Sequence, residues 1–212
     1  MGVKVEDQVA PSAASEGKAP RTARGERTLR KILEAARVEF GERGFADTSI
    51  VGITQRAAVA LGTFYTYFDS KESLFQALVR DMSEQVRDHV GPALSGGSDG
   101  LDNERRALDA FLGFVREHRD IYRIIDQSEF VDPAVYREHY DTTAERIAGR
   151  LRTARERGEI DKGFSDADLA VLAWGMMGAN VFLGLRFAVW DDADGESIAN
   201  VMSRVWRQGF AA

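Results

Sequence analysis

Apolar residues recur along most of the chain with the spacing of an α-helix. In residues 27–42, for example, one helical face carries Ile32, Leu33, Ala36 and Phe40. No stretch alternates between apolar and polar residues in the manner of a half-buried strand. The pattern therefore predicts an all-α protein.

Capping residues and glycines mark where these helices begin and end. Gly44 is expected to end the first helix, and Asp47, Thr48 and Ser49 offer N-cap oxygens to a second helix that ends near Arg56. Further helices are expected at about residues 61–68, 71–90, 102–118, 121–126, 133–156, 165–190 and 196–208.

The first helices follow one another in the order of a helix-turn-helix unit, whose second short helix enters the major groove of DNA. In "GTFYTYFDSKES", at residues 62–73, helical spacing places Phe64 and Phe68 on the inward face. The remaining residues form an outward set, namely Thr63, Tyr65, Thr66 and Tyr67. On spacing alone, nucleic-acid binding and a helical bundle with no such function both fit.

The outward set carries groups that suit a nucleic acid. Threonine and tyrosine hydroxyls donate to phosphate oxygens, and their apolar parts contact thymine methyl groups. Gly62 removes a side chain where the backbone would approach DNA. Lys71 lies in the first turn of the next helix, where a lysine opposes the helix dipole, and a phosphate opposite would offset that cost.

The segment from residue 165 to residue 190 is apolar on nearly all sides, with Asn180 the one strongly polar residue between Leu169 and Leu185. Such a helix must be buried on more than one side. A membrane span is the rival interpretation, but a run of about 17 residues is at the short limit for crossing a bilayer. We therefore expect it to be buried between the protein's own core and a second copy.

Charge is distributed unevenly along the chain, whose formal net charge is −6. Residues 18–80 hold 11 Lys or Arg against 7 Asp or Glu, whereas residues 81–212 hold 16 against 24. A basic head and an acidic body favour a head that meets a polyanion. The chain has no cysteine and its N-terminus has no apolar stretch long enough for a signal peptide, so a cytoplasmic location is expected.

Candidate catalytic groups are scattered. His89, His118 and His139 form no i, i+4 pair, and no phosphate-binding glycine loop or G-x-S-x-G motif occurs. We expect no enzymatic activity, no catalytic residues, no cofactor and no metal site.

About 48 residues, "ILEAARVEFGERGFADTSIVGITQRAAVALGTFYTYFDSKESLFQALV", resemble the DNA-binding domain of the tetracycline-repressor (TetR) family. The resemblance rests on "ILEAA", "F-x-E-R-G-F", "T-S", the "GTFYTYF" block and "SKE-x-L", in family-like order and spacing. It departs from the family at Ala60, where a capping serine is common, and at Leu61, where a polar or basic residue often lies.

The resemblance implies roles for individual residues. Thr48 and Ser49 match positions that contact the DNA backbone, Tyr65 matches a phosphate contact in the recognition helix, and Lys71 matches a phosphate-contacting lysine. The full DNA-binding set is Thr48, Ser49, Leu61, Gly62, Thr63, Tyr65, Thr66, Tyr67 and Lys71. A basic arm, consisting of Lys18, Arg21, Arg24, Arg27 and Arg30, is either a minor-groove contact or a solvated tail.

The resemblance also implies that the C-terminal helices dimerise and enclose a small, largely apolar effector. Candidate effector-pocket residues are Phe111, Phe114, Ile125, Tyr136, Tyr140, Trp174 and Met177. Candidate dimer-interface residues are Val181, Val189, Val201, Val205 and Trp206. For each residue of either set, plain core packing is the alternative.

The expected organisation is a disordered tail at residues 1–20, a three-helix DNA-binding domain at residues 21–70 and a larger effector-binding and dimerisation domain at residues 71–212. The expected function is that of a homodimeric repressor, bound to a palindromic operator and released by a small molecule, with no membrane partner. The alternative is a helical ligand-binding or scaffold protein that does not act on DNA. The sequence leaves open the effector, the operator, the regulated genes and whether binding represses or activates.

Overall fold

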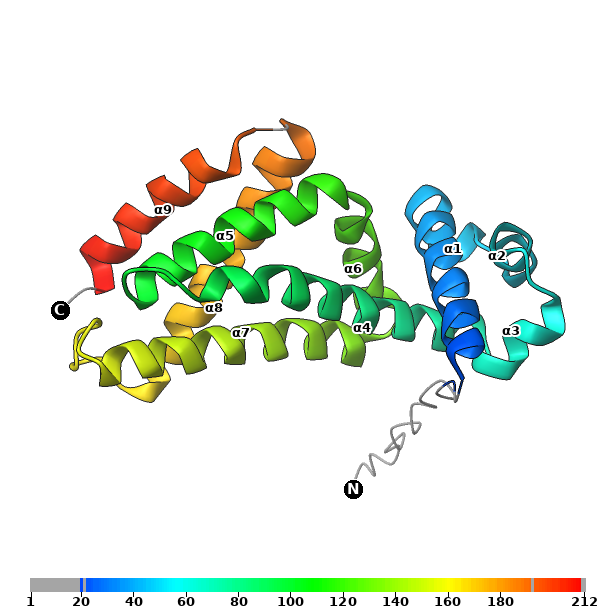
Figure 1. Ribbon diagram of the computed structural model, residues 1–212, viewed down its shortest axis with the longest axis horizontal. Helices are drawn as coiled ribbons and strands as arrows, with labels where there is room; N and C mark the ends of the chain where they lie inside the picture. The colour runs from blue at the N-terminus through cyan, green and yellow to red at the C-terminus, as the bar shows by residue number, and fades with distance from the viewer. Residues whose placement is uncertain (1–19, 21, 192, 211–212) are drawn as a thin grey trace, which may run out of the picture.

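The computed structural model describes residue 20, residues 22–191 and residues 193–210, and within these ranges every regular element is a helix. The all-α prediction is confirmed. The helices form a small head and a larger body (Figure 1). The predicted tail at residues 1–20 lies, apart from Pro20, outside the described residues.

The head is built from α1 (Ala23–Asp47), α2 (Ile50–Ala57) and α3 (Leu61–Tyr67), closed by the first turns of α4 (Lys71–Val90). Its core is a cluster of fully buried apolar side chains, of which the largest are Phe40, Phe64 and Phe75. Phe40 and Phe75 meet edge to face with ring centroids 5.1 Å apart. Three aromatic rings from three different helices therefore belong to one core shared by α1, α3 and α4.

Predicted capping residues set the ends of the head's helices. The Ser49 side chain accepts the amide of Gly52 at the start of α2, and Ser70 forms a reciprocal capping box with Ser73 at the start of α4. Gly44 has a φ of +83°, which breaks the helical path of α1 near the predicted end.

The body consists of α5 (Gly100–Glu117), α6 (Asp120–Val131), α7 (Pro133–Glu156), α8 (Asp166–Leu183) and α9 (Gly195–Phe210). A 3-10 turn, η1 (Gly91–Leu94), follows α4, and a π-helical segment, η2 (Gly184–Trp190), continues α8. The helix α4 begins in the head and runs along the body beside α5 and α7 (Figure 1). A movement of α4 against the body would therefore carry the head with it.

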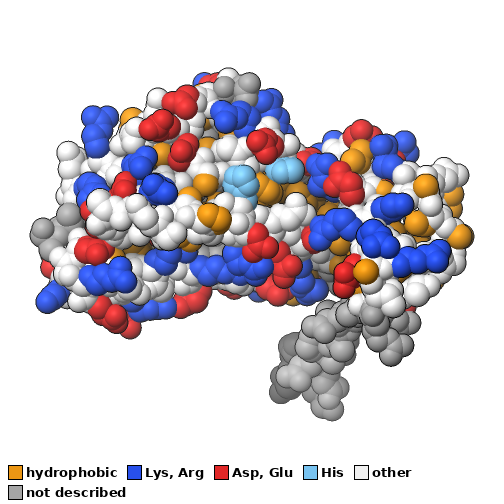
Figure 2. Space-filling model, in the orientation of Figure 1, with side chains coloured by type: hydrophobic (Ala, Val, Ile, Leu, Met, Phe, Trp, Pro, Cys, Tyr) orange, Lys and Arg blue, Asp and Glu red, His pale blue; other side chains and the backbone are white. Residues whose placement is uncertain are grey.

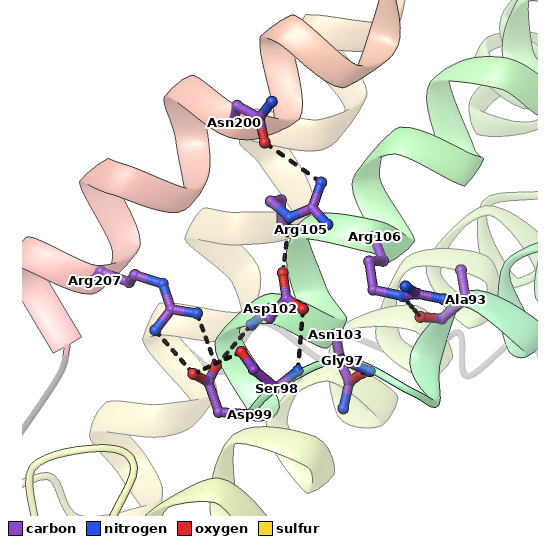
Figure 3. Close-up of polar contacts among 10 residues, drawn as sticks. All are labelled: Ala93, Gly97, Ser98, Asp99, Asp102, Asn103, Arg105, Arg106, Asn200 and Arg207. Atoms are coloured by element: carbon purple, nitrogen blue, oxygen red, sulfur yellow. Dashed lines mark hydrogen bonds and ion pairs between the residues drawn. The ribbon is translucent and has the colours of Figure 1, made fainter.

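The glycine-rich connection before α5 is fixed by side chains. Asp99 caps α5 by accepting the amide of Asp102, and its two carboxylate oxygens receive both terminal nitrogens of Arg207 at 3.0 and 2.9 Å. Arg105 of α5 donates to Asp102 and to Asn200 (Figure 3). These bonds join α9 to the N-terminal end of α5.

The apolar helix α8 is buried on one side. Leu169, Ala173, Met176 and Met177 face the body core, whereas other apolar side chains of the same helix are exposed. The span from Asp166 to Trp190 is long and apolar enough to cross a membrane by length and composition alone, and only 28% of its most apolar stretch is buried inside the protein. Core burial within one chain therefore accounts for only part of its hydrophobicity.

Candidate functional sites

The short helix α3 separates core residues from exposed ones as its spacing predicts. Phe64 and Phe68 are 0% and 2% exposed, whereas Tyr65 between them is 49% exposed. Leu61, at the start of the helix, is 46% exposed. Because Phe64 and Phe68 pack into the head, the opposite side of α3 is presented to solvent in a fixed orientation.

Six residues of the predicted DNA-binding set lie on the exposed side of the head. Ser49 at the start of α2 is exposed, as are residues 61, 62, 65 and 66, and Thr63 is half-buried. The Thr66 hydroxyl donates to the carbonyl oxygen of Gly62 at 3.2 Å. We define this set as the reading face: Ser49, Leu61, Gly62, Thr63, Tyr65 and Thr66.

Gly62 has no structural need to be a glycine. A Cβ built on it meets no atom within 4 Å, and the backbone is ordinary α-helix. Glycine in a helix costs about 1 kcal/mol relative to alanine. The fold therefore does not require a glycine at position 62, and this exposed point of the head is open to a close approach from outside.

Thr48, for which a contact with the DNA backbone is predicted, does not belong to this face, because its side chain is used within the protein. It is 2% exposed, and its hydroxyl donates to the carbonyl oxygens of Glu39 and Gly44 at 3.0 and 2.7 Å. Those carbonyls end α1, so Thr48 satisfies the terminus of that helix.

Tyr67 is likewise used within the head. It is half-buried against the core, and its hydroxyl donates to the carbonyl oxygen of Gly25 at 3.2 Å, which ties the end of α3 to the beginning of α1. The predicted outward orientation of Tyr67 is therefore replaced by a contact with α1.

Lys71 also turns inward. Its Nζ donates to the carbonyl oxygens of Phe45, Ala46 and Thr48 at 2.7, 3.3 and 2.8 Å, and lies 4.4 Å from the centroid of the Phe45 ring. An ammonium group has three N–H donors, so these carbonyls use all of them. The cost of a lysine in the first turn of α4 is offset by the end of α1, and the predicted phosphate contact is not needed to explain it.

A buried carboxylate holds α2 against α1. Glu39 is 3% exposed, and its Oε1 receives the Nε of Arg56 at 2.7 Å, while Arg43 lies 3.3 Å from its Oε2. Breaking such a pair leaves an uncompensated buried charge. The ion pair between Glu39 and Arg56 therefore fixes the angle between α1 and α2 of the head.

The predicted basic arm is only partly described. Lys18 and Arg21 lie outside the described residues, Arg24 and Arg27 are exposed on α1, and Arg30 pairs with Asp81 at 2.8 Å. On the side of the head that Figure 2 shows, Lys and Arg side chains are spread with acidic side chains among them.

A cavity of about 190 Å³ lies in the body between α4, α5, α6, α7 and α8. Four predicted pocket residues line it: Phe111, Ile125, Tyr140 and Met177. Val181, predicted for the dimer interface, lines it as well. Burial raises the pKa of the Tyr140 and Tyr122 hydroxyls, so both stay protonated and able to donate.

Three predicted pocket residues lie elsewhere. Phe114 is 4% exposed and packs against His118, with ring centroids 4.4 Å apart. Tyr136 packs edge to face on Tyr140 and is not part of the cavity wall, and Trp174 is 48% exposed on the outer side of α8. Aromatic character alone did not distinguish the residues that line the cavity from those that pack behind them or lie elsewhere.

Sequence reasoning missed the polar wall of the cavity. Arg87 of α4 and Arg146 and Arg150 of α7 line it together with Glu104 and His139. Arg150 forms a two-pronged ion pair with Glu104, which is 4% exposed. The i, i+4 spacing of Arg146 and Arg150 was the available signal, because it places both on one face of α7.

His139 is held neutral. Burial first, and the nearby Arg146 second, lower the pKa of its imidazole to about 4. Its Nδ1 lies 2.6 Å from the Ser83 hydroxyl oxygen, and that hydroxyl donates its single proton to the carbonyl oxygen of Val79. Nδ1 therefore carries the imidazole proton and donates to Ser83.

The outer side of α8, η2 and α9 carries a row of exposed apolar side chains. Val201 and Val205, both predicted for the dimer interface, are 50% and 55% exposed. The outer row also contains Trp174, which was predicted for the pocket, and three residues that sequence reasoning missed: Val171, Phe182 and Trp190.

Two predicted interface residues are placed differently. Trp206 is 3% exposed and belongs to the body core, so its assignment to the interface is wrong. Val189 is half-buried and packs against the same core. Trp206 belongs to α9 and Val189 to η2, and both of these elements pack on α5. The two side chains therefore contribute to the body core.

The helix α6 lies between the cavity and the head. Ile121, Tyr122 and Ile125 line the cavity. From the same helix Arg123 donates to the carbonyl oxygens of Gly41 and Glu42 at 2.8 and 2.9 Å. Gln127 accepts the amide of Phe45, and Asp120 pairs with Arg37, all at the end of α1.

Within the described residues, no group of three or more His, Cys, Asp or Glu side chains is arranged to hold a metal ion.

Known proteins share both the head sequence and the fold. The sequence model of the family described as "Bacterial regulatory proteins, tetR family" matches residues 32–78. The HTH-type transcriptional regulator UidR of Escherichia coli K12 is 27% identical over 191 residues, which cover 87% of this chain and 90% of UidR. The uncharacterised regulator YhgD of Bacillus subtilis is 24% identical over 85% of this chain and 95% of its own.

Solved structures show the same fold. A TetR-like transcriptional regulator from Rhodococcus sp. RHA1 superposes with a TM-score of 0.67 at 24% identity, covering 90% of this chain and 98% of its own. FadR from Bacillus subtilis, solved in complex with stearoyl-CoA, superposes with a TM-score of 0.72 at 17% identity over 83% of this chain and 96% of its own.

Proposed function

Because the chain belongs to the TetR family of bacterial transcriptional regulators, we propose that it is a cytoplasmic homodimeric repressor without enzymatic activity. Two copies bind a palindromic operator through the reading face and leave it when a small, largely apolar molecule fills the body cavity. In this proposal residues 21–70 bind DNA, and residues 71–212 bind the effector and dimerise.

The observation that carries the proposal is the open glycine in the reading face. Gly62 lies one turn of helix from Tyr65 and Thr66, with space around it that the protein does not use. A bare Cα there lets a phosphate backbone approach α3 closely, while the neighbouring hydroxyls donate to it.

A single α3 is too short to specify an operator. One recognition helix contacts only a few base pairs, so useful specificity requires two copies about one helical turn of DNA apart. The outer row on α8, η2 and α9 supplies an apolar surface for a second copy, because exposed patches of this kind mark association sites. The basic arm is a candidate minor-groove contact.

Effector control follows from the position of α6. The same helix lines the cavity and bonds to the end of α1 through Arg123, Gln127 and Asp120. A ligand that prefers one position of α6, and an operator that prefers another, oppose each other through that helix. The solved FadR neighbour holds stearoyl-CoA, which supports an effector with an apolar portion.

Duplex selection followed by fluorescence anisotropy tests the DNA-binding role. The purified protein is used to enrich a random duplex pool, and the affinity for the selected fragment is measured for the parent, Gly62→Ala and Gly113→Ala. Gly113 lies in α5, and a Cβ there also meets no atom within 4 Å, so it is a matched control.

We expect Gly62→Ala to fold with unchanged or higher stability and to bind at least about ten times more weakly, since a methyl group keeps the DNA backbone away. Gly113→Ala should bind as the parent does. If the pool yields no palindromic fragment, or if Gly62→Ala binds as tightly as the parent, the helical scaffold or ligand-binding protein becomes the better description.

A further inference from the structure

The cavity wall formed by α4 and α7 is basic. Arg87, Arg146 and Arg150 all line it, and the two arginines of α7 stand one turn apart. The carboxylate of Glu104 neutralises Arg150, and Asp88 pairs with Arg87 at 2.9 Å. Arg146 makes no hydrogen bond or ion pair with any residue in the described part of the chain, although Glu84 and Asp88 act on it at longer range.

Arg146 is exposed where it lines the cavity, and no group of the described residues accepts from its planar fork of N–H donors. Desolvation, and then repulsion from Arg87 and Arg150, lower the pKa of its guanidinium. Because Arg87 and Arg150 have carboxylate partners and Arg146 has none within hydrogen-bond distance in the described residues, an anion beside Arg146 would form a charge-assisted hydrogen bond there.

The rest of the cavity suits an apolar body. Val86, Val90, Leu94, Phe111, Ile125 and Met177 contribute apolar wall. The volume of about 190 Å³ is somewhat larger than the cavity of about 150 Å³ that holds one benzene molecule. A body of about eight carbon atoms is therefore of suitable size.

A carboxyl group and an amide group also line the cavity. Asp126 of α6 supplies the first of them, and burial, assisted by Glu129, raises the pKa of its carboxyl. Asn180 also lines the cavity, and its Oδ1 is buried without a hydrogen-bond partner in the described residues, so it can accept a hydrogen bond from a ligand's hydroxyl or amide group.

This inference rests on the proposed effector cavity and names the class of its ligand. We propose that the cavity takes a small amphipathic anion, with a carboxylate or phosphate group on the guanidinium of Arg146 and an apolar body of about eight carbons among α5, α6 and α8. Arg146 is then the residue that selects the charge of the effector.

Four probes that each contain eight carbon atoms test this inference by isothermal titration calorimetry on the full chain without DNA: octanoate, octyl phosphate, octan-1-ol and octylamine. We expect the two anions to bind at least about tenfold more tightly than the alcohol, and the amine to bind most weakly, because a charge-assisted hydrogen bond contributes more than a neutral one. The stronger of the two anions identifies the carboxylate or the phosphate as the natural group.

Three variants assign the effect to Arg146. Arg146→Gln should bring octanoate binding close to that of octan-1-ol, and Arg146→Lys should recover part of the loss. Arg137→Gln removes the same charge from an exposed position of α7 outside the cavity wall and should change nothing. Melting curves of all variants verify that each one is folded.

The inference is overturned if octanol binds as well as octanoate, if the amine binds best, if none of the probes binds, or if folded Arg146→Gln retains the parent's preference for anions. Because the readout contains no DNA, such a result leaves the DNA-binding proposal standing. Conversely, anion binding by a protein that selects no duplex would preserve this inference and reject the repressor role.

Discussion

The hydroxyl of Tyr122 donates a 2.6 Å hydrogen bond to the carbonyl oxygen of Val181. The amide of Leu185 also faces that hydroxyl, so the tyrosine stands between a carbonyl and an amide that would bond to each other in a regular α-helix. At this point α8 passes into the π-helical segment that begins at Gly184. An inserted side-chain group is an established cause of such a widening.

The folded protein should require a glycine at position 184 only because the Tyr122 hydroxyl occupies the space of a Cβ there. A Cβ at position 184 would overlap that hydroxyl, but would lie 3.4 Å from the Cζ of the same ring and 3.2 Å from Phe111. We expect Gly184→Ala to destabilise the parent by about 2–3 kcal/mol. In a Tyr122→Phe background the same change should cost less than about 1 kcal/mol. Urea denaturation of the parent, the two single variants and the double variant measures the coupling free energy between positions 122 and 184. Purely additive changes in the free energy of unfolding would show that the Tyr122 hydroxyl is not what requires the glycine.

Lys71 should act on the stability of the head rather than on the salt dependence of DNA binding. Lys71→Met keeps the apolar stem but leaves three carbonyl oxygens at the end of α1 without their donor. We expect a loss of about 2–3 kcal/mol in the free energy of unfolding. The slope of affinity against salt should stay within about half a unit of the parent's. Lys31→Met, at an exposed position of α1, is the control, and a flattened slope in Lys71→Met alone would restore the phosphate contact.

Tyr65 and Thr66 should have separable effects on operator binding. Tyr65→Phe removes a hydroxyl that reaches phosphate, so affinity should fall about three- to tenfold for every duplex tested, since phosphate contacts carry no sequence information. Thr66→Ala should change the preferred base at one position of each half-site. Competition anisotropy against a panel of single-base operator variants compares the two, and an unchanged base ranking in Thr66→Ala would remove it from base readout.

His139 should make the protein less stable as the pH falls below neutrality. Its imidazole has a pKa of about 4 in the folded protein and an unperturbed value of about 6.5 when unfolded. Between these values the unfolded state binds the extra proton, so the contribution is complete above about pH 6.5 and is lost on acidification to about pH 4. The loss should approach about 3 kcal/mol.

The variant His139→Gln isolates that contribution. Urea denaturation from pH 7 to pH 4 should show a smaller loss of stability in the variant, because every other titrating group is common to both proteins. Asp126, whose carboxyl pKa is raised by burial, contributes with the opposite sign in both. Parallel profiles would show that His139 is already protonated in the folded state.

Dimerisation should depend on the outer row. Phe182 is 72% exposed on α8, and a glutamate there would place a charge in the centre of the proposed interface. We expect Phe182→Glu to be a folded monomer by analytical ultracentrifugation. Phe130, 86% exposed at the end of α6, is the matched control, and Phe130→Glu should remain dimeric. Equal molar masses for both variants would place the interface elsewhere.

Local sequence determined the helices of this protein and the division within α3. The Ser49 and Ser70 caps, the break at Gly44 and the inward positions of Phe64 and Phe68 depend on neighbours within a few residues, which the sequence displays directly.

Tertiary structure decided how the polar side chains are used. The hydrogen-bonding partners of Thr48, Tyr67 and Lys71 come from the two ends of α1, at separations from 4 to 42 residues, and they turn three expected DNA contacts into internal ones. In the same way, helix packing buried Trp206 and brought Arg87, Arg146 and Arg150 together around one cavity. Helical periodicity reports which face of a helix a residue occupies, but the partner of that face depends on how distant helices pack.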